Sequence, residues 1–226
     1  MRSLHLVNGG CMLAHFKTEY PGLPVIAFEE AMCSGTAALP ILGPEFILER
    51  CRSLGAAKED YLRKIVRPLQ KLKDYEEYIL WFDEDMFCQI NLLTLPAYLQ
   101  QEALPLPQSC RIIDDRYQQK YEEALIQADY QNLFKQVVLE KQTLSFPGLL
   151  GKGIERYLAL NREENELTAY IREHSQTDRI SLMKEMLHQF SCYGLGDIQY
   201  LELIDRLRRN QITKQQHLSE NNKYLS

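Results

Sequence analysis

Short apolar runs alternate with amphipathic helical stretches over the first half of the chain. Four runs have the length and apolar content of strands: Ser3–Val7, Val25–Glu29, Glu77–Phe82 and Arg111–Asp114. Between them, apolar residues recur at helical spacing in Cys11–Glu19, Glu45–Leu54, Ala57–Lys73 and Asp85–Gln101. The first strand, helix and strand predict a parallel pair of strands joined by a right-handed crossover. Pro68 and Pro96 predict a kink or a break in the two longest helices.

The pattern changes after Arg116, where no further strand is predicted. Helical spacing dominates instead, in residues 118–141, 147–160, 162–174, 179–190 and 198–210. We therefore expect three segments: an α/β domain over residues 1–116, a helical domain over 117–212 and a flexible tail over 213–226. The expected fold class is α/β, with a small parallel-sheet, Rossmann-like three-layer half followed by an all-helical half.

Composition narrows the class of protein. The 226 residues carry a net charge of -5 and 45% hydrophobic residues, which is typical of a globular chain. The acidic balance makes a general nucleic-acid-binding protein an unfavoured class, although four basic residues cluster near the C-terminus: Arg206, Arg208, Arg209 and Lys214. Membrane-length apolar runs, an apolar leader and CxxC spacings are all missing from the sequence. We expect a cytoplasmic protein with no membrane segment.

A glycine-rich turn follows the first predicted strand. Asn8, Gly9 and Gly10 stand between that strand and the helix that begins at Cys11. In α/β folds, backbone N–H groups at such a helix start bind anions, so these three residues are candidate ligand-binding residues. The turn is neither a GxGxxG motif nor a Walker loop. A tight turn that needs a glycine with positive φ is the simpler explanation.

Three acidic residues follow the third predicted strand. Carboxylates at the carboxyl end of a strand can bind a hard cation such as Mg²⁺ or act as general acids and bases. Asp83 and Asp85 are therefore candidate metal ligands, and together with Glu30, at the end of the second strand, they are candidate catalytic residues. The alternative is helix capping by Asp85, with its neighbours favoured by the helix dipole.

The loop from Met32 to Pro44 is dense in small residues, and long loops of this kind often carry function. Cys33 could act as a nucleophile only if a cation, a histidine or a helix N-terminus lowered its pKa. His5 lies in the middle of a strand, where we expect a partly buried histidine with its hydrogen bonds satisfied. The sequence contains no established catalytic spacing such as HExxH.

Three segments in order, LHLVNGG, FEEAMCSG and LWFDEDMFCQINLL, resemble a bacterial family known as domain of unknown function 1835. The resemblance covers residues 3–100, with a weaker echo in YGLGDIQYLELIDRL. Position by position, it points to nine residues: His5, Asn8, Gly9, Glu30, Trp81, Asp83, Asp85, Phe87 and Gln89. The family usually has Asp where this chain has Gly10, which implies an altered or lost activity if that carboxylate is needed.

Two functions are compatible with these features. In the first, the α/β half binds a phosphorylated or nucleotide-like small ligand, with or without a divalent metal, between the two turns, and Gln89 orients the ligand. In the second, the chain is a non-catalytic protein-interaction or regulatory module whose helical half binds a partner or a second copy. Four aromatic residues could then form part of the interface, and the alternative is that they pack internally: Tyr117, Tyr121, Tyr130 and Phe134. The sequence does not decide whether the chain is an enzyme.

Overall fold

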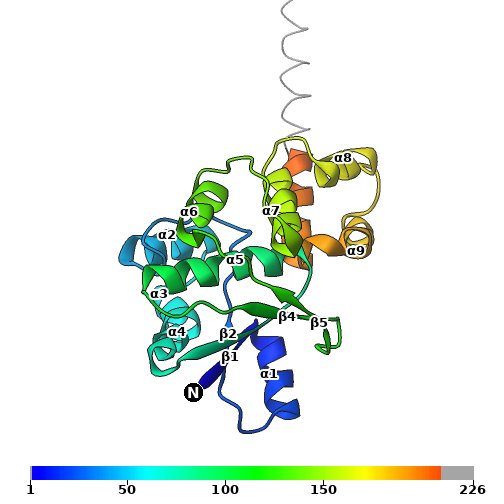
Figure 1. Ribbon diagram of the computed structural model, residues 1–226. Coiled ribbons are helices and arrows are strands. Elements are labelled where there is room, and N and C mark those ends of the chain that lie inside the picture. The colour runs from blue at the N-terminus through cyan, green and yellow to red at the C-terminus, as the bar shows by residue number, and fades with distance from the viewer. Residues whose placement is uncertain (1, 210–226) are drawn as a thin grey trace, which may run out of the picture. The chain divides into compact units, whose positions relative to one another are not determined.

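The computed structural model describes residues 2–209 of the chain. Within them, five strands form one sheet in the order β2-β1-β3-β4-β5 (Figure 1). The strands are β1 (Ser3–Asn8), β2 (Val25–Phe28), β3 (Glu77–Phe82), β4 (Ser109–Ile113) and β5 (Gln119–Ala124). The first four are parallel to their neighbours, and β5 runs antiparallel to β4. The α/β class and the parallel pairing of the first two strands are confirmed.

Helices connect the strands of this sheet. The α-helices up to residue 160 are α1 (Gly10–Glu19), α2 (Pro44–Leu54), α3 (Lys58–Tyr61), α4 (Arg67–Leu69), α5 (Met86–Gln101), α6 (Tyr130–Phe134) and α7 (Gly148–Leu160). A π-helical turn, Leu62–Val66, and a 3-10 segment, Gln70–Asp74, continue α3 and α4 into one helical stretch. Pro68 lies at the start of α4, directly after the wider π turn, where its missing N–H is tolerated. Pro96 lies inside α5 without ending it.

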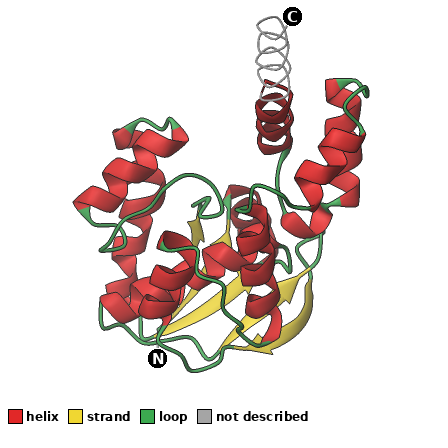
Figure 2. Ribbon diagram, turned by 90° about the horizontal axis from the view of Figure 1, so that it is seen from above, coloured by secondary structure: helices red, strands yellow, loops and turns green. Residues whose placement is uncertain are grey.

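Side chains alternate between the two faces of the sheet. On one face, α1 packs onto the strands through a cluster of buried residues: Val7, Met12, Phe16, Ala27, Trp81 and Ile113. The next residues along the strands, such as Leu6 and Leu80, point to the opposite face. Figure 1 shows α1 on one side of the sheet and α5 and α6 on the other. In Figure 2, helices lie across the strands.

Strand β5 contradicts the helix expected from residue 118. Its sequence, QKYEEA, is rich in residues that favour helices, and it is mostly exposed. Hydrogen bonding to β4 outweighs that preference, because tertiary pairing overrides local propensity. The sheet therefore continues past the boundary expected near residue 117, and the chain divides into two compact units, Met1–Leu158 and Ala159–Ser226. Between residues 125 and 147, helix is limited to α6 and the π-helical segment Lys135–Leu139.

The second unit is helical throughout its described residues. It contains α8 (Glu166–Glu173), α9 (Arg179–Gln189), a 3-10 turn (Ser191–Tyr193) and a helix through residues 197–209. Arg179 donates two hydrogen bonds of 2.7 Å to Asp205 and so joins α9 to the last helix. Arg208 donates to the carbonyl of Thr177 at 2.6 Å, which gives this basic residue a role within the unit. Lys214 and the tail expected over 213–226 lie outside the described residues.

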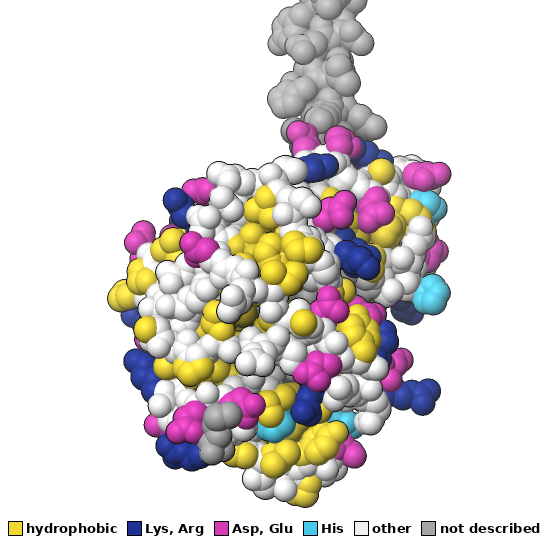
Figure 3. All heavy atoms as spheres, viewed as in Figure 1, with side chains coloured by type: hydrophobic (Ala, Val, Ile, Leu, Met, Phe, Trp, Pro, Cys, Tyr) yellow, Lys and Arg dark blue, Asp and Glu magenta, His cyan; other side chains and the backbone are white. Residues whose placement is uncertain are grey.

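The described residues also test parts of the expected interactions with membranes and with protein partners. No helix within residues 2–209 has both the length and the apolar content to cross a membrane. Acidic and basic side chains are interspersed over the face shown in Figure 3. Among the four aromatic residues proposed for an interface, Tyr130 and Phe134 are instead buried in the core, so that expectation is wrong for these two. Tyr121 remains exposed, and Tyr117 is half-buried.

Candidate functional site

The two turns singled out from the sequence lie at the same edge of the sheet. Strands β1 and β3 are adjacent and parallel, with Val7 opposite Trp81. The NGG turn (Asn8–Gly10, after β1) and the DED turn (Asp83–Asp85, after β3) therefore leave the sheet next to each other (Figure 1). From β1 the chain goes to β2 on one side, and it then returns to β3 on the other. Open α/β sheets bind ligands at such a reversal of strand order.

The NGG turn leaves the start of α1 open. Gly9 has a φ of 88° and donates its N–H to the carbonyl of Phe28 at 3.1 Å. Gly9 is the N-cap of α1, so no side chain caps this helix, and the first helical turn carries no acidic residue. Gly10 is exposed, and a Cβ placed there would lie 3.5 Å from Oε1 of Glu29. The first N–H groups of α1 thus have no side-chain cap, and the exposed carboxylate of Glu29 lies beside them.

Amide hydrogen bonds connect the NGG turn to α5. Nδ2 of Asn91 donates to Oδ1 of Asn8 at 2.9 Å and to the carbonyl of Glu30 at 2.5 Å. Oδ1 of Asn91 accepts the N–H of Met32 at 3.0 Å. Nδ2 of Asn8 donates in turn to Sγ of Cys88 at 2.8 Å. Asn8 is therefore held in place by α5, and its role is to fix the position of the turn.

Glu30 belongs to a buried ion pair. Its Oε1 accepts hydrogen bonds from Nε and Nη2 of Arg50 at 3.2 and 2.7 Å, and its Oε2 accepts one from the hydroxyl of Tyr61. Arg50 is fully buried and donates its other hydrogen bonds to three loop carbonyls, those of Ala31, Ser34 and Thr36. The pair therefore folds the loop after β2 onto α2. We assign Glu30 a structural role in place of the proton transfer suggested by the sequence.

In the DED turn, Asp85 caps α5 and has a raised pKa. Oδ1 of Asp85 accepts the N–H of Cys88 at 2.7 Å and caps α5, as the alternative explanation expected. Burial and, to a smaller extent, the nearby charge of Asp83 raise the pKa of Asp85 to about 6. Burial also raises the pKa of Asp83. Both carboxylates are therefore poorly solvated, which is common for groups that transfer protons or bind cations.

The structure limits which residues could bind the expected divalent metal. Within residues 2–209, no three side chains of His, Cys, Asp or Glu are grouped so as to hold a metal ion. Glu84 is bound by Lys120 at 2.8 Å and Tyr121 at 2.7 Å, and these hydrogen bonds lower its pKa. Asp83 and Asp85 are left as a pair. Two carboxylates suit Mg²⁺ when ligand phosphates supply further oxygens, but they are few for a resident metal.

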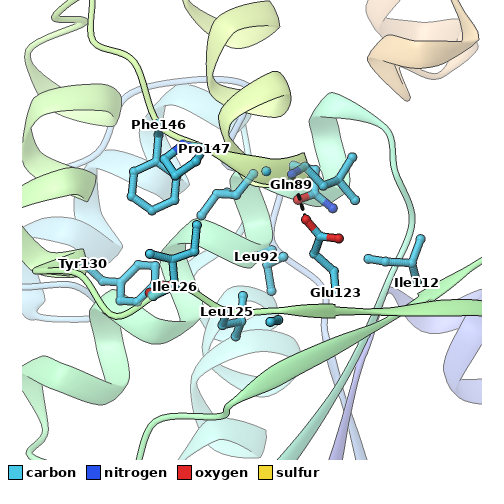
Figure 4. Close-up of a pocket in the computed structure, with 13 residues that line it drawn as sticks. Gln89, Leu92, Ile112, Glu123, Leu125, Ile126, Tyr130, Phe146 and Pro147 are labelled. Carbon is cyan, nitrogen blue, oxygen red and sulfur yellow. Dashed lines mark hydrogen bonds between the residues drawn. The ribbon is translucent and has the colours of Figure 1, made fainter.

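Gln89 lies in the interior of the first unit. Its Nε2 donates to the carbonyl of Asp83 at 2.7 Å, and its Oε1 is buried without a hydrogen-bond partner. It lines a cavity of about 20 Å³, where Glu123 accepts the N–H of Leu149 at 3.2 Å (Figure 4). Such a volume is close to that of a single water molecule. Gln89 therefore stabilises the DED turn through its bond to Asp83. The cavity is too small for a ligand to contact Gln89 through it.

Cys33 and His5 have the properties of structural residues. Burial raises the pKa of the Cys33 thiol to about 11, whereas a nucleophile needs a lowered value. His5 is buried, and its Nδ1 accepts the indole N–H of Trp81 at 2.9 Å. Burial lowers the pKa of His5, so it stays neutral near pH 7. We therefore place neither residue in a catalytic role.

Lys141 is a charged residue near the loop that follows β2, and no pattern in the sequence pointed to it. Its backbone is left-handed, with a φ of 53°, and its amine donates to the carbonyl of Val138 at 2.9 Å and to the hydroxyl of Tyr157. Partial burial, with the charge of Arg50 nearby, lowers the pKa of Lys141 to about 8. Only the fold brings Lys141 near Arg50, because no motif or spacing links them in the sequence.

The raised pKa of Asp85 predicts that removing its charge will stabilise the protein at neutral pH. Asn caps helices as well as Asp does, so Asp85→Asn keeps the bond to Cys88. The folded protein binds the Asp85 proton more tightly than the unfolded chain, so the wild type loses stability as the pH rises from about 4 to about 6. In urea denaturation, we expect Asp85→Asn to be more stable than the wild type by roughly 1–2 kcal/mol at pH 7.5, and no more stable at pH 4.

Asp178→Asn is the matched control. Asp178 caps α9 through the N–H groups of Ile180 and Ser181 at 3.1 and 3.0 Å, and it is exposed. Its hydrogen bonds lower its pKa, so loss of this charge should not stabilise the protein at pH 7.5. The same pH profile in both variants would contradict the poor solvation of Asp85.

The candidate site is therefore the uncapped start of α1, next to the turn that follows the neighbouring strand β3. The NGG and DED turns form its surface, and Asn91, Glu30 and Arg50 hold the surrounding backbone. No family model, no curated protein and no solved structure matches this chain.

Proposed function

We propose that the first unit binds a small phosphorylated ligand at the carboxyl edge of β1 and β3, with a phosphate group at the start of α1. The observation that carries this proposal is the open helix start at the point where the strand order reverses. The first N–H groups of a helix have no partner within the helix. Together with the helix dipole, they favour a phosphate over a neutral group.

Gly10 suits this turn to an anion. In the family that this chain resembles, domain of unknown function 1835, the usual Asp at this position would place a carboxylate where the phosphate would bind. Gly10 removes that negative charge, and the exposed side chain of Glu29 has room to move aside. On the other side of the proposed site, Asp83 and Asp85 would contact a Mg²⁺ ion bound to the phosphate. When the ligand binds without the metal, Asp85, with a pKa of about 6, is the group best matched to accept a proton near neutral pH.

A thermal-shift screen tests this function. The panel consists of inorganic phosphate, ribose 5-phosphate, AMP, ADP and ATP, each with and without Mg²⁺. A ligand at 100 times its dissociation constant adds about 2.7 kcal/mol of stability, which raises the Tm of a chain of this size by roughly 5–10 °C. We expect at least one compound to give such a shift. If every compound leaves the Tm unchanged, the proposal is wrong.

Gly10→Asp should abolish the shift. Gly10 does not have a positive φ, and a Cβ there meets its nearest atom at an ordinary 3.5 Å, so the variant should fold. The new carboxylate would lie beside Glu29 and repel the ligand phosphate. Gly10→Asn has nearly the same shape without the charge and should keep most of the shift. An equal response of both variants would show that the ligand does not bind at this turn.

A further inference from the structure

Strand β2 is an outer strand of the sheet, and one of its sides is unpaired. On the inner side, the carbonyl of Pro24 accepts the N–H of His5 at 2.9 Å. In a parallel ladder, alternate residues direct both backbone groups to the same side, so Val25 and Ala27 direct theirs away from β1. None of the described residues forms a backbone hydrogen bond with these groups. Such a row of N–H and C=O groups can accept another strand. Val25 is half-buried and only 4% of Ala27 is exposed, so a strand would have to reach these groups through the groove that they line.

A groove runs along this unpaired side. Its volume is 350 Å³, within the range of roughly 300–1,000 Å³ that is typical of ligand pockets. Helix α1 and the helical stretch that contains α4 form its walls, and they lie on either side of β1 and β2 in Figure 1. Its floor is partly apolar, with Leu13, Val25 and Pro68. Its rim carries one acidic residue, Glu29, and five basic residues: Lys17, Arg63, Lys64, Arg67 and Lys71. We call this set of residues the edge groove.

Basic residues outnumber acidic ones on the rim, where the one carboxylate, Glu29, lies close enough to Arg63 to add to the effect of Asp60 in raising its pKa. Arg63 is paired with Asp60 at 2.8 Å, and Arg67 is paired with Glu59. Lys17, Lys64 and Lys71 form no hydrogen bond or ion pair with any described residue and are all exposed. A single lysine beside an edge strand is explained by protection against unwanted pairing. Here, basic residues from two elements line one open groove, although the chain as a whole has a net charge of -5. This arrangement favours binding of an acidic segment in the groove.

We propose that the edge groove binds an extended acidic segment of a partner protein, which adds to the sheet beside β2. The main chain of the segment would pair with Val25 and Ala27. Alternate side chains of a strand point to opposite sides, so apolar residues would contact the floor and acidic residues would contact the lysines. A second copy of this chain is a poorer occupant, because two basic rims would face each other.

A fluorescent nine-residue peptide of alternating glutamate and valine is the probe. We expect saturable binding to the full chain that weakens between 50 and 500 mM salt, and no binding of a lysine–valine peptide of the same length. Lys17→Glu with Lys64→Glu should weaken binding about tenfold or more. Lys58→Glu with Lys184→Glu makes the same change in net charge at exposed positions away from the groove, so it should change binding less than twofold. Equal losses in the two double variants would overturn the proposal.

Amide hydrogen exchange on the wild-type protein tests strand addition without relying on any variant. The bound glutamate–valine peptide should slow exchange at Val25 and Ala27 and leave Ile26, whose N–H faces β1, nearly unchanged. Binding without this protection would mean charge attraction only, and the proposed strand would be wrong. Tighter binding of a single-stranded oligonucleotide than of the acidic peptide would assign the groove to nucleic acid and would also overturn the proposal.

Discussion

Replacing Arg50 by methionine should remove a large part of the stability of the protein. The variant would leave the carboxylate of Glu30 buried without its counter-charge, and three loop carbonyls would lose their donor. Removing one partner of a buried pair typically lowers stability by about 3–5 kcal/mol. Whole proteins have only about 5–15 kcal/mol, so Arg50→Met should be partly unfolded or show a much lower urea midpoint by circular dichroism.

Arg52→Met is the control for this variant. Arg52 lies on the same helix and pairs with Glu49 at 2.7 Å, but 71% of its side chain is exposed. Exposed pairs of this kind contribute about 0–1 kcal/mol, so the urea midpoint should change little. If the two methionine variants lost similar amounts of stability, the buried pair could not be what holds the loop after β2 in place.

Asn91→Leu should be the second most damaging change. Leucine keeps the branching of the side chain but removes the bonds to Asn8, to the Glu30 carbonyl and to the Met32 N–H. Because these partners are at least partly buried, we expect a loss of about 2–4 kcal/mol. The same change should weaken binding of any ligand found in the thermal-shift screen, since Asn8 positions the NGG turn. Urea denaturation measures the first effect, and titration of the folded variant measures the second.

Thr94→Val is the matched control, because Thr94 is also polar and buried on α5. Its hydroxyl donates to the carbonyl of Ile90 at 2.9 Å, one turn earlier in the same helix. Loss of such a local bond should lower stability by less than about 1 kcal/mol. A loss in Asn91→Leu no larger than in Thr94→Val would mean that the network between the NGG turn and α5 contributes little.

The parallel core of the fold could be predicted because its signals are local. The run EYILWF gives β3 its correct limits, since a strand buried in a parallel sheet needs a continuous apolar stretch. Both turns were also identified, because glycine and clustered acids interrupt the apolar pattern. Their position at one edge follows from β1 and β3 being parallel neighbours, a pairing that the sequence did not predict.

The features that were missed depend on distant contacts. Strand β5 has the composition of a helix, and only pairing with β4 makes it a strand. Arg50, in the helical segment ERCRSL, has no feature that distinguishes it from the exposed Arg52 until the loop after β2 folds around it. For the same reason Glu30 seemed a catalytic candidate, although its carboxylate is bound by Arg50 and Tyr61. The role of a buried charged residue depends on the residue that it pairs with, and only the folded structure shows which residue that is.

The most direct test of the central claim is to map the ligand site by ¹H–¹⁵N chemical shifts. The wild-type protein would be titrated with the phosphorylated compound that gives the largest thermal shift. We predict that the largest changes occur at the amides of residues 10–12, at the start of α1, with smaller changes at residues 83–88 around the DED turn. Changes confined to other parts of the chain, with the amides of Gly10 and Cys11 unmoved, would contradict a phosphate site at the NGG turn.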